Sequence, residues 1–197
     1  MIQGSVGVDL AGSPKRNTGI AYVDDSFEID HAIVISDYEI VEYVLNKRPS
    51  LVVIDAPLFL PKGRRSLDTR QDIHLRECDR ELIRRKIRFF PVTLGPMRML
   101  TKRGILLASI LREKGFRVFE GYPGASQDIL GVPRKKKGVQ ALAKGLRELG
   151  LNAGEWSHDE LDALTVAYVG WLHLHGKTEL IGDPSEGLMV LPRPDSR

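Results

Sequence analysis

Along the first 36 residues, the pattern of hydrophobic and polar positions predicts three strands joined by short loops. An apolar run at 6–10 is separated by a polar, glycine-containing loop at 11–17 from a second β-prone run at 19–23. Residues 24–26 are typical of a tight turn, and the stretch 27–35 begins with apolar and polar residues in alternation. Consecutive short strands of this kind favour an antiparallel meander.

The rest of the chain alternates between helical and extended patterns. Ser36 and Glu39 have the spacing of a capping box, and the apolar stripe after them stops before Pro49. Residues 51–54 form a continuous apolar run, as in a strand that is covered on both faces. A second capping box at 157–160 begins a long final helix that runs to about residue 175. We also expect helices at about 68–87, 97–114 and 139–149, a strand at 116–119 and a short strand at 187–191.

Charge is distributed unevenly along the 197 residues. The segment 62–147 carries 22 basic and 8 acidic side chains, whereas residues 1–61 carry 4 and 9, and residues 148–197 carry 3 and 9. A strongly basic middle segment between two acidic ends indicates a surface that faces a polyanion such as nucleic acid. The alternative is a set of helices whose lysines and arginines face only water. We predict a single domain over residues 1–197, within which residues 58–115 form a basic helical insertion.

The chain shows no pattern for membrane insertion or secretion. No apolar run approaches the length of a membrane span, and the N-terminus lacks a basic segment followed by an apolar one. We therefore expect a cytoplasmic protein without a membrane partner. The single cysteine, Cys78, excludes an internal disulfide framework and a multi-cysteine zinc site. Its charged, helical surroundings favour a helix-face residue over a nucleophile.

Five acidic residues are candidates for the chemistry of this protein. Asp9, Asp55 and Glu120 each end an apolar segment, and ligands gather at the carboxyl ends of strands in open α/β sheets. Asp159 and Asp162 are three positions apart and therefore share one face of the final helix. Burying a carboxylate without a partner is costly, so this set calls for a cation. The alternatives are strand-end hydrogen bonds for Asp9 and stabilisation of the helix dipole for Asp159.

Converging carboxylates suit Mg²⁺, with Mn²⁺ as a substitute, because hard divalent cations prefer oxygen ligands. Two such ions about 4 Å apart activate a water and stabilise the leaving oxygen when a phosphodiester is cleaved. Basic side chains would hold the phosphate backbone through salt-sensitive contacts that are independent of sequence. The candidates for these contacts are Lys15, Arg16, Arg64, Arg65, Lys102, Arg103, Arg134, Lys135, Lys136 and Lys137. For the cluster at 134–137, a solvated turn is the alternative interpretation.

Six short motifs together resemble one known family. They are Gly7-Val8-Asp9, Ile54-Asp55-Ala56-Pro57, Arg76-Glu77-Cys78-Asp79-Arg80, Phe119-Glu120-Gly121-Tyr122-Pro123, His158-Asp159-Glu160-Leu161-Asp162-Ala163 and Gly182-Asp183-Pro184-Ser185-Glu186-Gly187. Over nearly its whole length the chain resembles the ribonuclease H-like superfamily, with its RuvC-type and YqgF-type branches. It is most similar to domain-of-unknown-function family 429, whose members are predicted nucleases. The resemblance implies an α/β fold in which a mixed sheet, made of an antiparallel three-strand meander plus parallel strands, is flanked by helices.

The resemblance also implies roles for individual residues. Four acids match the metal ligands of the superfamily: Asp9, Asp55, Glu120 and Asp162. Asp159 is a candidate additional ligand, and His158 would lie beside the ligands without binding the metal itself. The segment 76–80 matches the narrower family, and the resemblance gives it no role.

These patterns predict a Mg²⁺-dependent nuclease that hydrolyses phosphodiester bonds of DNA or RNA by a two-metal mechanism. Asp9 would bridge the two ions, and Asp159 would bind an ion or orient the water. A nucleic-acid-binding protein of the same fold without catalysis is the alternative. The turn between Asp9 and Gly19 also resembles the phosphate loop of sugar-kinase and actin-like ATPases. By that resemblance, however, those proteins need a duplicated domain and a longer chain.

Overall fold

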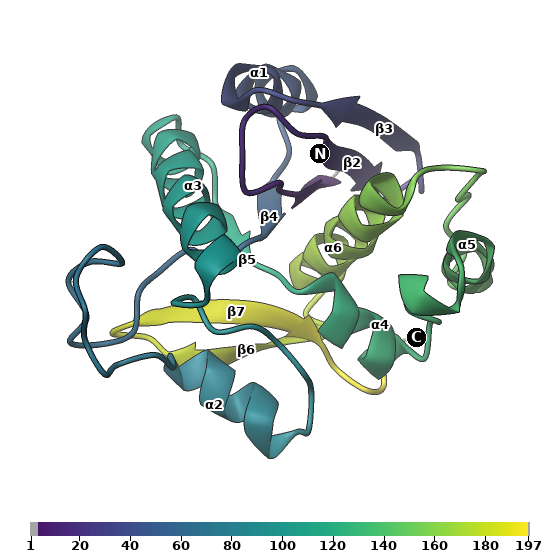
Figure 1. The fold of residues 1–197 in the computed structure, drawn as a ribbon. Helices are drawn as coiled ribbons and strands as arrows, with labels where there is room; N and C mark the ends of the chain where they lie inside the picture. The colour runs from purple at the N-terminus through teal and green to yellow at the C-terminus, as the bar shows by residue number, and fades with distance from the viewer. Residues whose placement is uncertain (1–3, 197) are drawn as a thin grey trace.

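A seven-stranded sheet runs through the computed structural model of this chain, which describes residues 4–196 (Figure 1). The strands are β1 (Gly4–Asp9), β2 (Thr18–Asp24), β3 (Ile29–Val34), β4 (Leu51–Asp55), β5 (Val118–Glu120), β6 (Thr178–Asp183) and β7 (Gly187–Pro192). Their order across the sheet is β3-β2-β1-β4-β5-β7-β6.

The pairing directions are those of the ribonuclease H-like arrangement predicted from the sequence. The first three strands form an antiparallel meander, and β4, β5 and β7 continue the sheet in parallel from β1. The last neighbour, β6, pairs antiparallel with β7. The predicted fold class is therefore confirmed. One consequence is that the carboxyl ends of β1, β4 and β5 meet at the same edge of the sheet.

Helices cover both faces of the sheet. They are α1 (Asp37–Lys47), α2 (Glu77–Arg84), α3 (Gly95–Glu113), α4 (Pro123–Leu130), α5 (Val139–Glu148) and α6 (His158–Leu174), with a short 3₁₀ turn, η1, at Lys135–Lys137. Both predicted capping boxes are present, at Ser36 for α1 and at Ser157 for α6. In Figure 1, α6 lies across one face near α4 and α5, whereas α1 and α3 belong to the opposite side.

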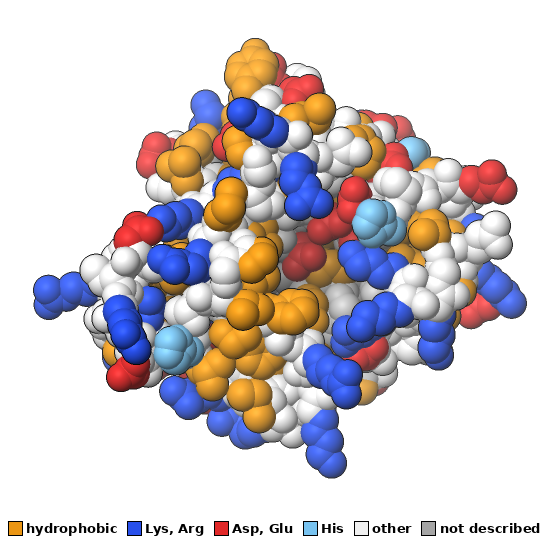
Figure 2. All heavy atoms as spheres, in the orientation of Figure 1, with side chains coloured by type: hydrophobic (Ala, Val, Ile, Leu, Met, Phe, Trp, Pro, Cys, Tyr) orange, Lys and Arg blue, Asp and Glu red, His pale blue; other side chains and the backbone are white. Residues whose placement is uncertain are grey.

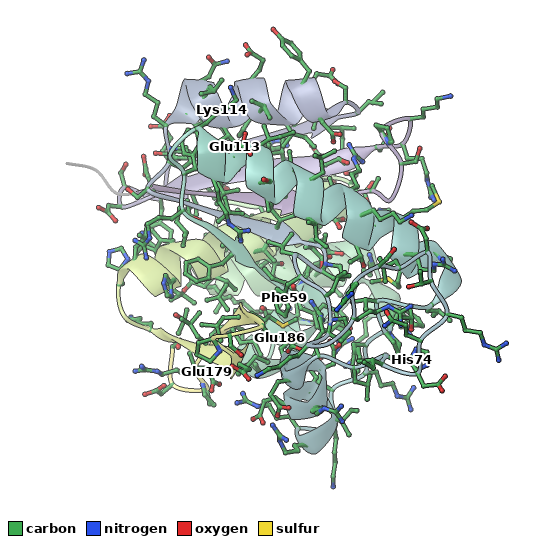
Figure 3. The ribbon with its side chains drawn as sticks, turned by 90° about the vertical axis from the view of Figure 1, so that its left-hand side faces the viewer. Phe59, His74, Glu113, Lys114, Glu179 and Glu186 are labelled. Atoms are coloured by element: carbon green, nitrogen blue, oxygen red, sulfur yellow. The ribbon has the colours of Figure 1, made fainter. Side chains whose placement is uncertain are left out.

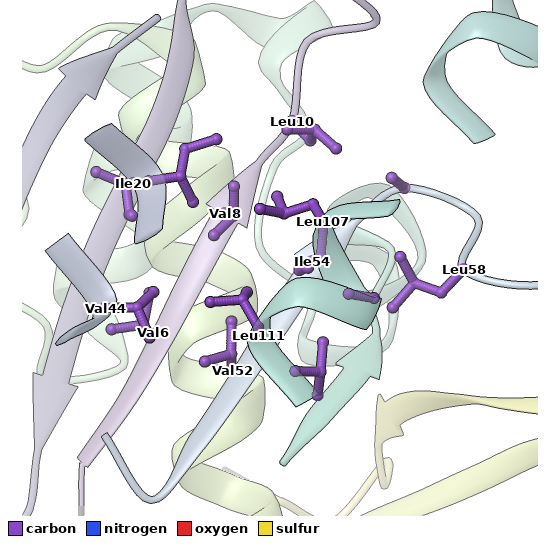
Figure 4. Packing of buried hydrophobic residues seen from close by; sticks show 14 of the residues in the cluster. Val6, Val8, Leu10, Ile20, Val44, Val52, Ile54, Leu58, Leu107 and Leu111 are labelled. Carbon is purple, nitrogen blue, oxygen red and sulfur yellow. The ribbon is translucent and has the colours of Figure 1, made fainter. Parts of the chain in front are cut away.

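The core follows from the alternation of side chains along the strands. Val6 and Val8 of β1 and their neighbours on β4 pack against Val44 of α1 and Leu107 of α3, and all of these side chains are fully buried (Figure 4). On the opposite face, Gly7 gives α6 room to approach. A Cβ atom at Gly7 would collide with the backbone of α6 at Ala163. This close approach sets the N-terminal half of α6 directly over β1 and β2.

The segment 58–115 differs in part from expectation. We expected a helix over about 68–87, but only α2, Glu77–Arg84, is helical there. The reason is Arg64, whose buried guanidinium donates hydrogen bonds to the carbonyl oxygens of Thr69, Gln71 and Ile73. These carbonyls are thereby held in an irregular loop. The second helix of the segment, α3, packs against the sheet and contributes side chains to its core, so it belongs to the main body of the fold.

Two elements were not predicted from the sequence. Helix α4 follows Tyr122 directly and begins with Pro123 at its first position, a sequence that we had interpreted only as the end of a strand. Strand β6 precedes the predicted final strand and pairs with it. The turn between β6 and β7 carries Glu186, whose carboxylate accepts hydrogen bonds from the backbone N–H groups of Lys62 and Glu77. Figure 3 shows Phe59 and Glu186 beside each other, where the 58–76 loop meets this turn.

The length and hydrophobicity of the helices show whether any of them could span a membrane. Within residues 4–196, no helix is both long enough and apolar enough to span a bilayer.

Candidate active site

Asp9 and Asp55 occupy adjacent strand ends. They are paired in register as the last residues of the parallel strands β1 and β4, and both residues are partly buried. Burial raises the pKa of Asp55 to about 8, with a further increase from the charge of Asp162. Burial likewise raises the pKa of Asp9 well above its usual value, with the charges of Asp55 and Asp162 adding to the shift.

Helix α6 brings two more acids to this point. Asp162 is nearly fully buried, and Asp159, one turn nearer the start of α6, is partly exposed. The charge of Asp162 acts on both strand-end carboxyls, and that of Asp159 acts on Asp9. Figure 2 shows acidic side chains gathered at a hollow on this face, with basic side chains around it. The four acids that meet here, called the carboxylate cluster below, are Asp9, Asp55, Asp159 and Asp162.

Asp162 has two partners that determine its position. The buried amide of Gln127 donates a hydrogen bond of 2.7 Å to its Oδ1, and the Lys135 ammonium lies 2.9 Å from its Oδ2. Gln127 also lies 3.2 Å from the hydroxyl of Thr165. We did not identify Gln127 from the sequence, because it lies on α4, which was not predicted. The local signal was a polar side chain that directly follows the small residues at 124–126.

The charge balance of the cluster fits a divalent cation. One ammonium, that of Lys135, faces several carboxylates and lowers the pKa of Asp9 and Asp55, yet both values remain raised. Such an excess of buried negative charge, carried by oxygen donors alone, suits a hard cation such as Mg²⁺. In their present positions, however, no three His, Cys, Asp or Glu side chains in the described part of the chain are arranged to hold a metal ion.

Glu120 has a different environment from the other predicted ligands. It is fully buried beside Asp55, and its Oε2 accepts hydrogen bonds from Arg76 Nη1 at 2.7 Å and from the backbone N–H of Leu58 at 2.9 Å. Arg76 in turn forms a bidentate pair with Asp79. Glu120 therefore lies outside the group of acids that meet at Asp9, and its role as a metal ligand stays a prediction. Its carboxylate is committed to a buried ion network that connects α2 with β5.

This network and the β6–β7 turn explain motifs that had no role at first. Arg76 and Asp79 form the buried pair, and Cys78 between them is fully buried, where burial raises the pKa of its thiol. Cys78 thus faces the interior from α2 and lacks the exposure of a nucleophile. Glu186 holds the 58–76 loop and the start of α2 against β7. The two motifs together attach this loop to the edge of the sheet that bears the carboxylates.

The ten predicted phosphate contacts fall into three groups. Arg64 and Arg103 are buried, and Arg103 pairs with Asp37 and donates to backbone carbonyls, so neither is free to bind a phosphate and both leave the set. Three others form ion pairs with acids: Lys102 with Asp68, Arg134 with Asp128, and Lys135 with Asp162. The remaining five are exposed to solvent: Lys15, Arg16, Arg65, Lys136 and Lys137.

His158 lies at the entrance of the cluster. It is the first residue of α6, its side chain is about half exposed, and its Nε2 is 3.2 Å from Oδ1 of Asp159. The imidazole therefore contacts a carboxylate of the cluster.

A cavity of about 890 Å³ opens beside the cluster. Asp55, Asp162 and Gln127 line it, together with apolar side chains of α2, the loop after α2 and the start of α4. This is the hollow that Figure 2 shows between the acidic side chains and a hydrophobic patch. A concave, mostly apolar site with a few converging polar groups is the usual form of a ligand site.

Comparisons with known proteins confirm the family expected from the motifs. Among solved structures, the Thermus thermophilus RuvC structure is similar at 13% sequence identity and a TM-score of 0.49, over 88% of this chain and 97% of that chain. This likeness is too low to carry an inference about activity. No curated protein matches the chain significantly. The model described as "Protein of unknown function (DUF429)" matches residues 7–187, and the chain therefore belongs to that family.

Proposed function

We propose that this protein is a Mg²⁺-dependent phosphodiesterase that acts on nucleic acid. The observation that carries the proposal is the convergence of Asp9, Asp55, Asp159 and Asp162 at one edge of the sheet, where burial and mutual repulsion raise the pKa of the first two. Buried carboxylates in such proximity are stable only with protons or with a bound cation. The exposed Lys136 lines the cavity beside this edge and supplies positive charge for the substrate backbone.

The proposed role of each side chain follows from its position. Asp9 and Asp55 would hold the metal from the sheet, and Asp162 would hold it from α6, with Gln127 fixing the orientation of its carboxylate. Asp159, which is more exposed and contacts His158, is placed to bind or orient the attacking water. When bound, the metal polarises the phosphate and lowers the pKa of that water.

Metal binding on this proposal requires Lys135 to leave Asp162. The ammonium is half exposed and lies on the short turn η1, so it can move without disturbing the core. Lys135→Gln removes a cation that competes with the metal, and we expect Mn²⁺ to bind about 3–5-fold more tightly to the variant. Isothermal titration of metal-stripped protein with Mn²⁺ measures this change, with Lys136→Gln as the matched control. Unchanged or weaker Mn²⁺ binding by Lys135→Gln would show that the ammonium does not compete.

Cleavage itself is tested with labelled single-stranded, duplex and branched oligonucleotides in Mg²⁺ or EDTA. Asp9→Asn removes a central ligand, and we expect it to reduce Mg²⁺-dependent cleavage about 100-fold or more. Asp72→Asn is the control, because Asp72 is an exposed acid in the 58–76 loop, outside the carboxylate cluster. Cleavage that persists in Asp9→Asn, or that ignores EDTA, would contradict the proposal.

The Lys135–Asp162 ion pair favours a second candidate function. If the ammonium permanently takes the place of a metal, the protein binds nucleic acid through its basic surface and does not cleave it. Binding would then weaken steeply with salt, would be indifferent to EDTA, and would be accompanied by no cleavage of any substrate. Measuring oligonucleotide binding and cleavage side by side separates the two candidates.

A further inference from the structure

The cavity beside the carboxylate cluster has an apolar wall that catalysis by the acids does not require. Phe90 and Ile83 lie on this wall with 68% and 52% of their surface exposed, among the most exposed large hydrophobic residues in the described part of the chain. Tyr122 and Ile87 extend the wall toward α4 and the loop after α2. Exposing such side chains to water is unfavourable, so a wall of this kind indicates a ligand that covers it.

The charges around the wall define the chemistry of that ligand. Lys86, Arg88 and Lys136 line the same cavity, all three are exposed, and none of them forms an ion pair with a residue that the structure describes. A purely apolar partner would leave these cations without a counterion. A ligand that combines a flat apolar surface with nearby negative charge satisfies both the wall and its rim, and a nucleotide has this combination in its base and its phosphate.

The size and position of the cavity limit the form of the nucleotide. A volume of about 890 Å³ is within the range of small-molecule sites, which is roughly 300–1,000 Å³. A base inside a duplex is stacked on both faces and cannot enter such a site, whereas an unpaired base can present its face to an aromatic ring. Asp55 and Asp162 line the same cavity, so a base on the wall would bring its backbone near the carboxylates.

We propose that the wall formed by Phe90, Ile83 and Tyr122 binds the base of an unpaired nucleotide whose phosphate lies toward the carboxylate cluster. The preferred substrates are then single strands, flaps or bulges, and continuous duplex is disfavoured. This inference rests on the proposed function for its choice of a nucleic acid. Phe90 is the stacking platform, because it is the most exposed aromatic side chain of the cavity.

The test measures binding in EDTA, so that it is independent of catalysis. The probes are a short fluorescein-labelled single strand, its duplex, and the single strand with abasic sites, each followed by fluorescence anisotropy. We expect Phe90→Ala to weaken single-strand binding roughly 5–50-fold and to leave duplex binding unchanged. Phe90→Trp retains a stacking surface and is expected to bind like the wild type. Tyr38→Ala is the matched control, since Tyr38 is equally exposed but lies on α1, away from the cavity.

The abasic probe tests the proposal without any change to the protein. We expect it to bind the wild type as weakly as the intact strand binds Phe90→Ala. Equal binding of abasic and intact strands, equal binding of duplex and single strand, or no effect of Phe90→Ala would overturn the inference. A change in oligomeric state on Phe90→Ala with unchanged oligonucleotide binding would also overturn it, because the wall would then be a contact between copies of the chain.

The outcomes for this inference and for the proposed function remain separable. If the wild type cleaves nothing but binds single strands through Phe90, the base site stands and the catalytic proposal falls. If Mg²⁺-dependent cleavage depends on Asp9 but acts on duplex and is unaffected by Phe90→Ala, catalysis stands and the base site falls.

Discussion

Replacing Asp55 by asparagine is expected to stabilise the metal-free protein near pH 8, by up to about 5 kcal/mol, although it removes a proposed metal ligand. Burial and the charge of Asp162 raise the pKa of Asp55 from 3.8 to about 8 in the folded protein. Between these two values, the unfolded chain releases the proton of Asp55 while the folded chain retains it. Unfolding is therefore increasingly favoured as pH rises from about 4 to about 8. Asparagine has no proton to release, so the stability of the variant does not fall with pH through this group.

Urea denaturation in EDTA at several pH values between 4 and 8 measures this effect. The wild type should lose stability steadily as pH rises, and Asp55→Asn should lose less, with the difference largest at the upper end. Mg²⁺ should reverse the order by stabilising the wild type and leaving the variant unchanged, because binding to the folded state adds stability. Asp72→Asn, an exposed acid, should follow the wild type throughout. If Asp55→Asn were the less stable protein near pH 8 in EDTA, the electrostatic description of the cluster would be wrong.

Arg76→Met is expected to destabilise the protein by about 3–5 kcal/mol. Arg76 is buried, and its guanidinium is the charged partner of both Glu120 and Asp79, which are buried as well. Removing it leaves two carboxylates without a cation in a region that excludes water. The nearby Arg80 provides a control, because it is about half exposed and its pair with Glu77 is long, at 3.7 Å. Arg80→Met should cost less than about 1 kcal/mol.

A combined variant separates the lost charge balance from lost packing. Arg76→Met together with Asp79→Asn and Glu120→Gln removes all three charges at once, and we expect it to recover most of the stability. Urea unfolding of the single and triple variants gives the comparison. If Arg76→Met costs no more than Arg80→Met, the buried network contributes little, and its role in holding the 58–76 loop would have to be abandoned.

The network also explains why Glu120 differs from Asp9 and Asp55, although all three end a strand. The sequence places each acid after an apolar run, and local pattern cannot distinguish among them. In the structure, Arg76 lies close to Glu120 and far along the chain from it, with 43 residues between them. Glu120 is paired with the guanidinium of Arg76, whereas Asp9 and Asp55 have no arginine partner among the described residues. This difference separates a structural acid from a candidate ligand.

The sequence by itself determined the elements whose signals are local. Strand runs, the capping boxes at Ser36 and Ser157, and the three-residue spacing of Asp159 and Asp162 depend on neighbours within a few positions, and the structure contains them. The meander followed by parallel strands then brought the carboxyl ends of β1 and β4 to one edge, as expected. These features follow from backbone hydrogen bonding and side-chain periodicity. Both can be recognised in short stretches of sequence.

Only the tertiary structure decided which charged side chains form ion pairs or hydrogen bonds within the protein and which remain unpaired. The pairing of Glu120 with Arg76, the burial of Arg64 and Arg103, and the contacts of Gln127 and Lys135 with Asp162 all join separate elements. The exposed wall at Phe90 was likewise decided by the tertiary structure, because its exposure depends on which other elements pack over it. Hydrogen bonds and ion pairs are satisfied by any partner that reaches the right position in space. The sequence therefore reveals how many charged side chains a chain carries. Which of them pair with one another is decided by how the elements pack.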